Sequence, residues 1–515
     1  MQGKKINQGK LFFMFRLSEH IPANNLYRRI NETIDFRFLY KATARFYGRE
    51  GQKSIDPVVF MKLILAGYLE NMQSDRKIVD TLRLRLDIRY FIGYDLEEEL
   101  PCHSTLSRTR KLYKEDVFTE LFKKVLEQCI DKGMVSGRRQ AVDSVFIKAN
   151  AAIDSMERKG IIADAVVYTQ ELKANEETDS TDNTEPKTNH HSNEQGGDPG
   201  RPQSNQVNTE QSLSLSYKNP EPDQVKTKRP KVSSDTHYSP TDPDSRLAIK
   251  SGKALALNYL GQVCVDTATH MITHVQAFTA DNRDSECLPE VLENMVNNLK
   301  ENDITVHEIV ADTNYSSGTA LKKLEEMDIT GYIPNIGAYK YEREGFTYHP
   351  EGDYYECRNG RALNLQGIYD GDKRYTRTQK NCKGCPFKET CIGDKREIAL
   401  TESVYKPYYD QMHIRMQTKK AGRLKIKRQS TAEPVIGSLV GNHGIKKVNS
   451  RGLAQANKCL TMAAIAYNLK KLLKFKPKHI QDNINELNKG INKGICQIIA
   501  AIEHALLTNT AFMAH

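Results

Sequence analysis

The chain has 515 residues, of which 38% are hydrophobic, and it carries a formal net charge of +10. No apolar run reaches the roughly eighteen residues of a membrane-spanning helix, so we expect a soluble protein, and the length indicates about two to four globular domains. The positive charge favours a polyanionic partner, although on charge alone a basic protein without such a partner is equally compatible. Because no secretory signal is recognisable, we expect a cytoplasmic protein.

Residues 1–135 are predicted to form a helical amino-terminal domain that binds DNA. Asp56 and Pro57 are typical of a helix start, and Ser74 precedes a second helix whose outer face is basic. A third helix should begin near His103, where hydroxyl and basic side chains have the pattern of a segment that contacts phosphates. A solvated helical face is the alternative. The candidate DNA-binding residues on this helix are Arg108, Arg110 and Lys111.

A single carboxylate, Asp143, interrupts the apolar stretch 140–147, which has the aliphatic and β-branched composition of a buried strand. An ionised carboxylate in such a strand is costly unless a cation or hydrogen-bond donors meet it. We therefore assign residues 136–171 to the first part of a catalytic domain. The segment 172–240 is predicted to be a disordered insertion, because residues 174–206 contain no Ile, Leu, Val, Met, Phe or Tyr.

Residues 241–345 are predicted to form the second part of the catalytic domain. Two strands joined by a turn at 267–270 form a hairpin, and a helix follows at 288–299. The next apolar strand, 306–312, ends on Asp312, and a further helix and strand complete an α/β pattern. Sites in α/β folds lie at the carboxyl ends of strands, so Asp312 is a second candidate catalytic residue.

Four cysteines gather in residues 346–400 with the spacing Cys-x24-Cys-x2-Cys-x5-Cys. Four thiolates that include one Cys-x2-Cys pair suit a tetrahedral structural zinc in a small, loop-rich knuckle. Ordinary free thiols are the alternative, and in either case we interpret the segment as an insertion in the catalytic fold. The candidate zinc ligands are Cys357, Cys382, Cys385 and Cys391.

Residues 401–475 are predicted to hold a basic segment and the carboxyl-terminal catalytic helices, followed by a helical tail at 476–515. Glu433 stands out as a lone acid within the basic tract. Pro434 biases the residue before it away from α geometry, so we expect Glu433 at a helix entrance or next to a kink. The candidate DNA-binding residues of this part are Arg415, Arg423, Arg428, Lys446, Lys447 and Arg451.

Asp143, Asp312 and Glu433 together suggest a site for divalent cations. Three carboxylates without metal would repel one another, whereas one or two divalent cations turn that repulsion into binding. Oxygen-only ligands point to Mg²⁺ or Mn²⁺, and two such ions can activate a water or a 3′-hydroxyl at a phosphodiester. Taken singly, each acid suits a structural role equally well. The competing acids are Asp244, Asp266 and Asp281, of which the last is placed in a structural loop.

Three motifs surround the candidate acids: Gln140-Ala-Val-Asp-Ser144, Ile309-Val-Ala-Asp-Thr-Asn-Tyr-Ser-Ser-Gly318, and Glu433-Pro-Val-Ile-Gly437 with Asn468-Leu-Lys-Lys471 downstream. In this order they resemble bacterial insertion-sequence transposases of the DDE superfamily, and the helical segment with Asp56-Pro57 and Ser74-Asp-Arg76 resembles the amino-terminal domain of that family. The family often has an arginine shortly before the glutamate and a lysine after it. Here Gln429 and Val440 occupy those positions, so Arg428 and Lys446 or Lys447 would substitute.

The resemblance implies an RNase H-like fold, a mixed α/β sheet flanked by helices, with Asp143, Asp312 and Glu433 as the metal-binding triad. It implies a DNA transposase that binds the terminal inverted repeats of its insertion sequence and catalyses metal-dependent cleavage and strand transfer. The expected partner is double-stranded DNA, bound by a homodimer at the nucleoid and away from membranes. The alternatives are a non-catalytic DNA-binding regulator derived from a transposase and a nuclease without strand transfer.

Overall fold

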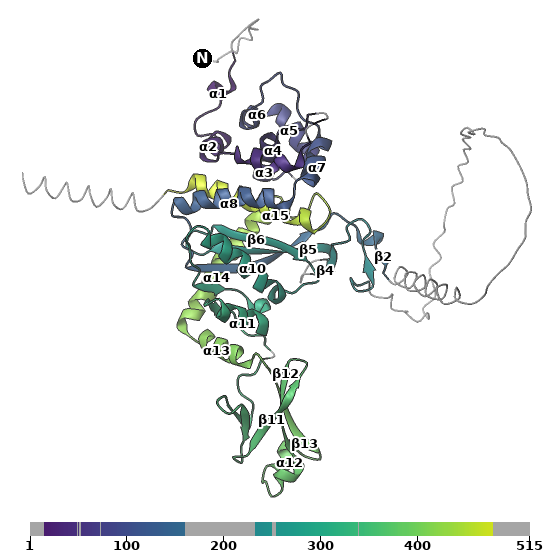
Figure 1. Cartoon of the computed structure of the whole chain (residues 1–515), viewed down its shortest axis with the longest axis vertical. Helices are drawn as coiled ribbons and strands as arrows, with labels where there is room; N and C mark the ends of the chain where they lie inside the picture. The colour runs from purple at the N-terminus through teal and green to yellow at the C-terminus, as the bar shows by residue number, and fades with distance from the viewer. Residues whose placement is uncertain are drawn as a thin grey trace, which may run out of the picture. The chain divides into compact units, whose positions relative to one another are not determined.

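The computed structural model of the chain is shown in Figure 1. The chain divides into two compact units, and the smaller one, Met156–Tyr238, contains the antiparallel pair of β2 (Glu157–Arg158) and β3 (His237–Tyr238). The predicted helical tail at 476–515, apart from Lys476, and most of the predicted insertion at 172–240 lie outside the described residues. The structure describes residues 15–48, 50, 53–72, 74–159, 232–249, 254–337 and 339–476.

The amino-terminal part is helical, as predicted. Its elements are α1 (Leu17–His20), α2 (Leu26–Thr33), α3 (Phe38–Thr43), η1 (Ala44–Phe46), α4 (Pro57–Leu69), α5 (Asp75–Leu84), α6 (Leu86–Ile92), α7 (His103–Leu112) and α8 (Glu115–Asp131). α4 is the central helix, since nine of its thirteen residues are buried and it contacts α3, α5, α6 and α7. It begins as the sequence predicted, because the Asp56 carboxylate accepts hydrogen bonds from the backbone N–H groups of Val58 and Val59.

A mixed sheet forms the centre of the larger unit. Its strands are β1 (Arg139–Lys148), β4 (Arg246–Ala248), β5 (Ala256–Asp266), β6 (Ile272–Thr279), β7 (Glu308–Val310) and β8 (Thr330–Tyr332). β5 lies antiparallel between β1 and β6, β4 pairs with the start of β5, and β7 and β8 continue the sheet parallel to β1. This arrangement confirms the predicted α/β class with an RNase H-like mixed sheet.

Helices flank the sheet (Figure 1). α10 (Asp284–Lys300) packs on β6 and β5, α11 (Gly318–Glu326) and α13 (Lys406–Met416) contact β8, and α14 (Lys419–Asn442) lies against β1 and β5. In α15 (Leu453–Lys474), sixteen of twenty-two residues are buried, because this helix contacts β6 as well as α8 and α4. It thereby joins the amino-terminal helices to the sheet. None of the helices in the described ranges is long and apolar enough to cross a membrane.

The outer backbone edge of β6 is covered by two asparagines of α15. An edge strand presents N–H and C=O groups that need partners outside the sheet. The Asn468 side chain donates to the Ile272 carbonyl at 2.8 Å and accepts from the Ile272 N–H at 3.1 Å. Asn457 makes the same pair of bonds with Ala277, at 3.3 Å and 2.7 Å. The helix therefore completes the hydrogen bonding of the strand.

Replacement of Asn468 by alanine should lower the free energy of unfolding by roughly 2–4 kcal/mol, because the buried N–H and C=O of Ile272 would both lose their partner. The smaller loss is expected for Asn457→Ala, since its bonds are partly open to water. Urea unfolding of the two variants beside the wild type measures both values. Equal stability of Asn468→Ala and wild type would contradict this role.

Buried His274 on β6 makes the stability of the fold depend on pH. Its Nδ1 accepts from the Asn298 amide at 3.2 Å and its Nε2–H donates to Gln276 at 3.3 Å, which satisfies the neutral ring. Burial lowers the pKa of His274 from 6.5 to about 4. Between these values the unfolded chain binds a proton that the folded chain does not, so stability is lost as the pH falls through this window, by up to roughly 3 kcal/mol.

The variant His274→Gln tests this prediction. Melting temperatures of wild type and variant between pH 7 and pH 4 should fall less steeply for the variant. Some dependence should remain, because burial also lowers the pKa of His443 to about 4. Identical slopes for the two proteins would show that His274 does not contribute.

A second, antiparallel sheet has the strand order β13-β12-β11-β10-β9. Its elements are β9 (Phe346–His349), β10 (Tyr354–Cys357), β11 (Ala362–Tyr369), β12 (Asp372–Thr378), η5 (Gln379–Cys382), α12 (Lys388–Cys391) and β13 (Glu397–Ser403). Tyr355, Leu363 and Tyr375 form its small core. The sequence predicted a loop-rich knuckle here, and the strands escaped notice because most of their residues are polar and at least partly exposed.

Candidate active site

Asp143 lies in the middle of β1, with a side chain that is 16% exposed. Its Oδ2 accepts a hydrogen bond from Nη1 of Arg428 at 2.9 Å, and its Oδ1 accepts from the Ser144 N–H at 2.9 Å. Burial raises the pKa of Asp143, and the charges of Asp312 and Asp284 act in the same direction, whereas Ser144 and Arg428 oppose it. The cation and the donor that the sequence required are therefore both present.

Asp312 follows β7, the parallel neighbour of β1. The register pairs Ala141 with Val310, and Asp143 and Asp312 each lie two residues farther along. Since adjacent strands are roughly 5 Å apart, the two acids occupy matching positions side by side. The Asp312 side chain also accepts from the Asn314 N–H at 2.9 Å and so caps the turn η4 (Thr313–Tyr315). The structure thus brings the first two predicted acids together.

Glu433 lies inside α14, where the sequence predicted a helix entrance or a kink. The helix runs unbroken from Lys419 to Asn442 with Pro434 in its interior. Its buried residues, from Ala421 to Leu439, form a stripe, and the helix packs on β1 and β5. Packing along this stripe outweighs the hydrogen bond that the proline removes. Glu433 is therefore not at a helix entrance, and it directly precedes the proline inside the helix.

Arg428 connects this helix to the strand that carries Asp143. While Nη1 bonds Asp143 at 2.9 Å, Nη2 lies 3.8 Å from Oε1 of Glu433, whose side chain is 60% exposed. Arg428 itself is buried, and its guanidinium serves two of the three predicted acids. Arg428, five residues before the glutamate, is the arginine that the sequence suggested as a substitute, and it contacts both of these acids.

A fourth acid, Asp284, escaped the sequence analysis. It is the first residue of α10, and its charge raises the pKa of Asp143. Gln262 of β5 donates to Asp284 at 2.7 Å and accepts from the hydroxyl of Tyr315, which is fully buried. The charges of Asp284, Asp143 and Asp312 all act on Tyr315 and raise its pKa, after the larger effect of burial. The helix predicted from the sequence began at residue 288, so Asp284 lay outside it.

The competing acids have structural partners. Asp266 accepts from the backbone N–H groups of Ser136, Gly137 and Ala268, and Asp244 accepts from the N–H of Leu453 at the start of α15. Asp281 pairs with Arg246 at 3.1 Å, as expected of a loop residue.

Within the residues that the structure describes, no group of three or more His, Cys, Asp and Glu side chains is placed to hold a metal ion. Arg428 supplies the positive charge between Asp143 and Glu433. The donor set still fits Mg²⁺ chemically, because paired carboxylate oxygens, two of them in matching strand positions, are the ligands that this hard cation prefers.

Three of the predicted DNA-binding arginines contact protein groups. Arg110 bonds both oxygens of Asp75 at 2.8 Å and 2.5 Å, and Arg415 bonds the Gly331 carbonyl at 3.0 Å. Arg428 bonds Asp143, as described above.

The other predicted basic residues are exposed: Arg108, Lys111, Arg423, Lys446, Lys447 and Arg451. Lys446 and Lys447 lie beside the end of β1, since Lys148 N–H donates to the Lys446 carbonyl at 3.3 Å and the Val448 N–H donates to the Lys148 carbonyl at 2.8 Å. Lys148 is exposed as well, so three lysines meet at one strand end. No signal in the sequence could have joined Lys148 to lysines three hundred residues away.

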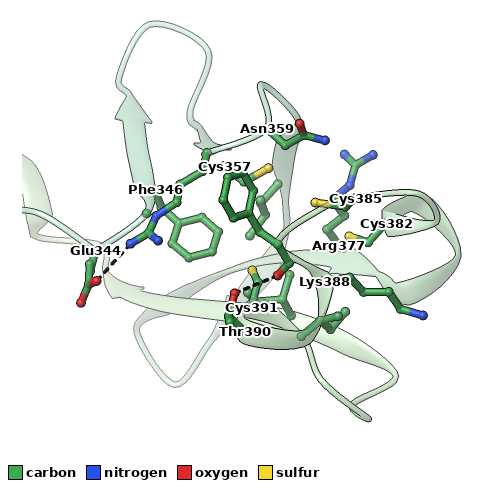
Figure 2. A pocket seen from close by; sticks show the side chains of 16 residues that line it. Glu344, Phe346, Cys357, Asn359, Arg377, Cys382, Cys385, Lys388, Thr390 and Cys391 are labelled. Atoms are coloured by element: carbon green, nitrogen blue, oxygen red, sulfur yellow. Dashed lines mark hydrogen bonds and ion pairs between the residues drawn. The ribbon is translucent and has the colours of Figure 1, made fainter.

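The four predicted zinc ligands line one pocket of the second sheet (Figure 2). Cys357 ends β10, Cys382 ends η5, Cys391 ends α12, and Cys385 lies between the last two. Each is a free thiol. Burial raises the pKa of Cys391, and the charges of the other three sulfurs add to this effect, which shows that all four lie close together.

The chain matches two models of protein families. Residues 15–112 match a transposase domain (DUF772), which spans the helices from α1 to α7. Residues 356–473 match a transposase DDE domain, which runs from β10 to α15 and includes Glu433. A search of curated proteins gave no match.

Among solved structures, the chain is similar to the Mos1 transposase paired-end complex with left transposon end, at 9% sequence identity. The similarity covers 59% of this chain and 67% of that chain, with a TM-score of 0.16, so it carries no weight in placing individual residues. The chain therefore carries two transposase domains, one at residues 15–112 and one of the DDE type at residues 356–473.

Proposed function

We propose that this transposase acts on an insertion sequence, binding its terminal inverted repeats, cleaving the DNA there and joining the freed 3′ ends to a target. Asp143, Asp312 and Glu433 would be the metal ligands. The observation that carries this proposal is the matching position of Asp143 and Asp312 on adjacent parallel strands, together with the Arg428 contacts that tie Asp143 to the helix of Glu433.

Carboxylate oxygens of these three residues would hold two Mg²⁺ or Mn²⁺ ions, which supply activation of a water or 3′-hydroxyl and stabilisation of the leaving oxygen. The chain itself orients these oxygens. β1 and β7 fix Asp143 and Asp312 in register, and the bond from Gln262 fixes Asp284 beside them. The hydroxyl of Tyr315 donates to Gln262, so a buried chain of hydrogen bonds runs from Tyr315 through Gln262 to Asp284.

Arg428 would act as the internal counter-ion of the site. Burial raises the pKa of Asp143, and the charges of Asp312 and Asp284 add to this effect, so the charged form of Asp143 needs a nearby positive charge. The guanidinium supplies this charge at 2.9 Å from Asp143 and reaches Glu433 at 3.8 Å. We infer that it keeps the acids in place before DNA and metal bind.

The DNA backbone would lie along exposed basic groups near these acids. Arg423 is on the same helix as Glu433, and the three lysines Lys148, Lys446 and Lys447 meet at the end of the strand that carries Asp143. Lysine and arginine side chains bind phosphates without regard to sequence. Recognition of particular element ends would then fall to the amino-terminal helices, where Arg108 and Lys111 are exposed on α7.

A labelled duplex that contains the DNA flanking the coding region tests the proposal. Nicking and joining are measured separately with Mg²⁺ and Mn²⁺, beside a duplex of shuffled sequence. A transposase nicks and joins the flanking DNA, a nuclease nicks without joining, and a regulator binds without either reaction. Metal-dependent joining supports the proposal, and binding alone would overturn it.

A further inference from the structure

The sheet of β9 to β13 has little apolar core. Among residues 339–405, the buried hydrophobic side chains are Tyr355, Leu363, Tyr375 and Ile392, and the first three form one cluster. The segment 379–396, which connects β12 to β13, contributes only Ile392. Small modules whose core is this thin usually need a covalent or metal cross-link to hold their loops.

Two tight turns present cysteines to the pocket. The Gly360 N–H donates to the Cys357 carbonyl at 2.8 Å, and the Cys385 N–H donates to the Cys382 carbonyl at 3.2 Å. Gly384, inside the second turn, has a φ of +74°, which glycine adopts without strain. Cys391 closes the short helix α12, with its N–H bonded to the Phe387 carbonyl at 2.9 Å. The backbone around each thiol is therefore ordered by hydrogen bonds.

Cationic side chains line the same pocket: Arg358, Arg377 and Lys388. Figure 2 labels the last two. Two nitrogens of Arg377 are satisfied, by the Ala362 carbonyl at 2.7 Å and the Asn381 carbonyl at 3.0 Å. Its Nε is buried without a hydrogen-bond partner in the described structure. A buried unpaired donor is costly, and a metal-bound thiolate is an acceptor that would satisfy it.

We propose that Cys357, Cys382, Cys385 and Cys391 bind one structural zinc ion in tetrahedral geometry. No three of these thiols already form a finished ligand set, so binding would draw the turns of segment 379–396 onto Cys357. The thiols release their protons to solvent as they bind, and the ion with four thiolates carries a net charge of −2. Arg377 and Lys388 offset that charge, while Arg358 is already paired with Glu344 at 3.0 Å. This site is independent of the chemistry proposed at Asp143.

Zinc content of the purified full-length protein tests the site. Wild type prepared in zinc-containing medium should hold about one zinc per chain. Single replacements of Cys357, Cys382 and Cys391 by serine should each remove it. Cys102→Ser is the matched control, because Cys102 is exposed on the loop before α7 and lies outside the pocket, so its zinc content should equal that of wild type. Substitution with Co²⁺ should give the visible absorption of tetrahedral cobalt thiolate.

Limited proteolysis tests the same site in the wild-type protein, so the result does not depend on whether a cysteine variant folds. Segment 379–396 contains five trypsin sites, namely Lys380, Lys383, Lys388, Lys395 and Arg396. In wild type, a strong zinc chelator should speed cleavage there, and added zinc should reverse the effect, while the central sheet stays intact. Absence of zinc in reduced protein, zinc retained in the serine variants, iron in its place, or unchanged cleavage after chelation would each overturn the proposal.

Discussion

Asp143→Asn is expected to lower metal-dependent nicking of end-containing DNA by more than about 100-fold, beyond the 10–100-fold that loss of an outer-sphere partner costs at a metal site. The amide oxygen of asparagine can still accept the hydrogen bond from Arg428, so the variant should fold. What it lacks is the negative charge that a divalent cation requires. Rates of nicking at fixed Mg²⁺, with melting temperature as a check on folding, measure the effect.

Asp312→Asn should show the same loss, because its carboxylate lies beside Asp143 in register. Asp281→Asn is the matched control, since this acid is 50% exposed and pairs with Arg246 outside the site. It should nick like wild type. If Asp143→Asn and Asp281→Asn cut at equal rates, the assignment of the acidic surface as the catalytic site would have to be abandoned.

Arg110→Ala is expected to destabilise the amino-terminal helices by roughly 3–5 kcal/mol, the cost of leaving one partner of a buried ion pair alone. The Arg110 side chain is 5% exposed and the Asp75 side chain 15% exposed, and two hydrogen bonds of 2.8 Å and 2.5 Å join them between α7 and α5. The loss should appear as a lower midpoint in urea unfolding of the full chain.

Arg108→Ala, two residues earlier on the same helix, should give the opposite result. Arg108 is exposed, so stability should stay within about 0.5 kcal/mol of wild type. The affinity of the variant for DNA at low salt should be lower than that of wild type. The slope of the logarithm of the binding constant against the logarithm of the salt concentration should become smaller by about 1, as expected for the loss of one phosphate contact. We assign a structural role to Arg110 and a DNA contact to Arg108. An Arg108 variant that unfolds, or an Arg110 variant that is stable but binds DNA weakly, would contradict these two roles.

The two arginines show where sequence reasoning ended. Both belong to one basic run, which the sequence treated as a single phosphate-contacting face. Two residues turn by roughly 200° around an α-helix, so one side chain faces solvent while the other faces α5. Only the packing of α5 on α7, which pairs Asp75 with Arg110, decides which arginine remains available to DNA.

Some of the acids near the candidate site were recognisable in the sequence, and one was found only in the structure. Apolar flanks predicted the strands of Asp143 and Asp312, and the motifs around them predicted the family. The sequence did not show Asp284, because the helix predicted from it began at residue 288 and left this acid outside. Asp284 lies near Asp143 only because α10 packs against β5. Hydrogen bonds from Tyr315 to Gln262 and from Gln262 to Asp284 fix this contact.

Local composition and motif order thus predicted the α/β class, the helical amino-terminal part, the resemblance to transposases, and the strands on or after which Asp143 and Asp312 lie, since strand and helix patterns are short-range properties of the chain. The tertiary structure alone decided that Glu433 lies within a continuous helix, that Arg428 joins it to Asp143, and that three lysines from distant segments share one strand end. These facts arise from strand register and helix packing, which are set by contacts between residues hundreds of positions apart and leave no local trace in sequence.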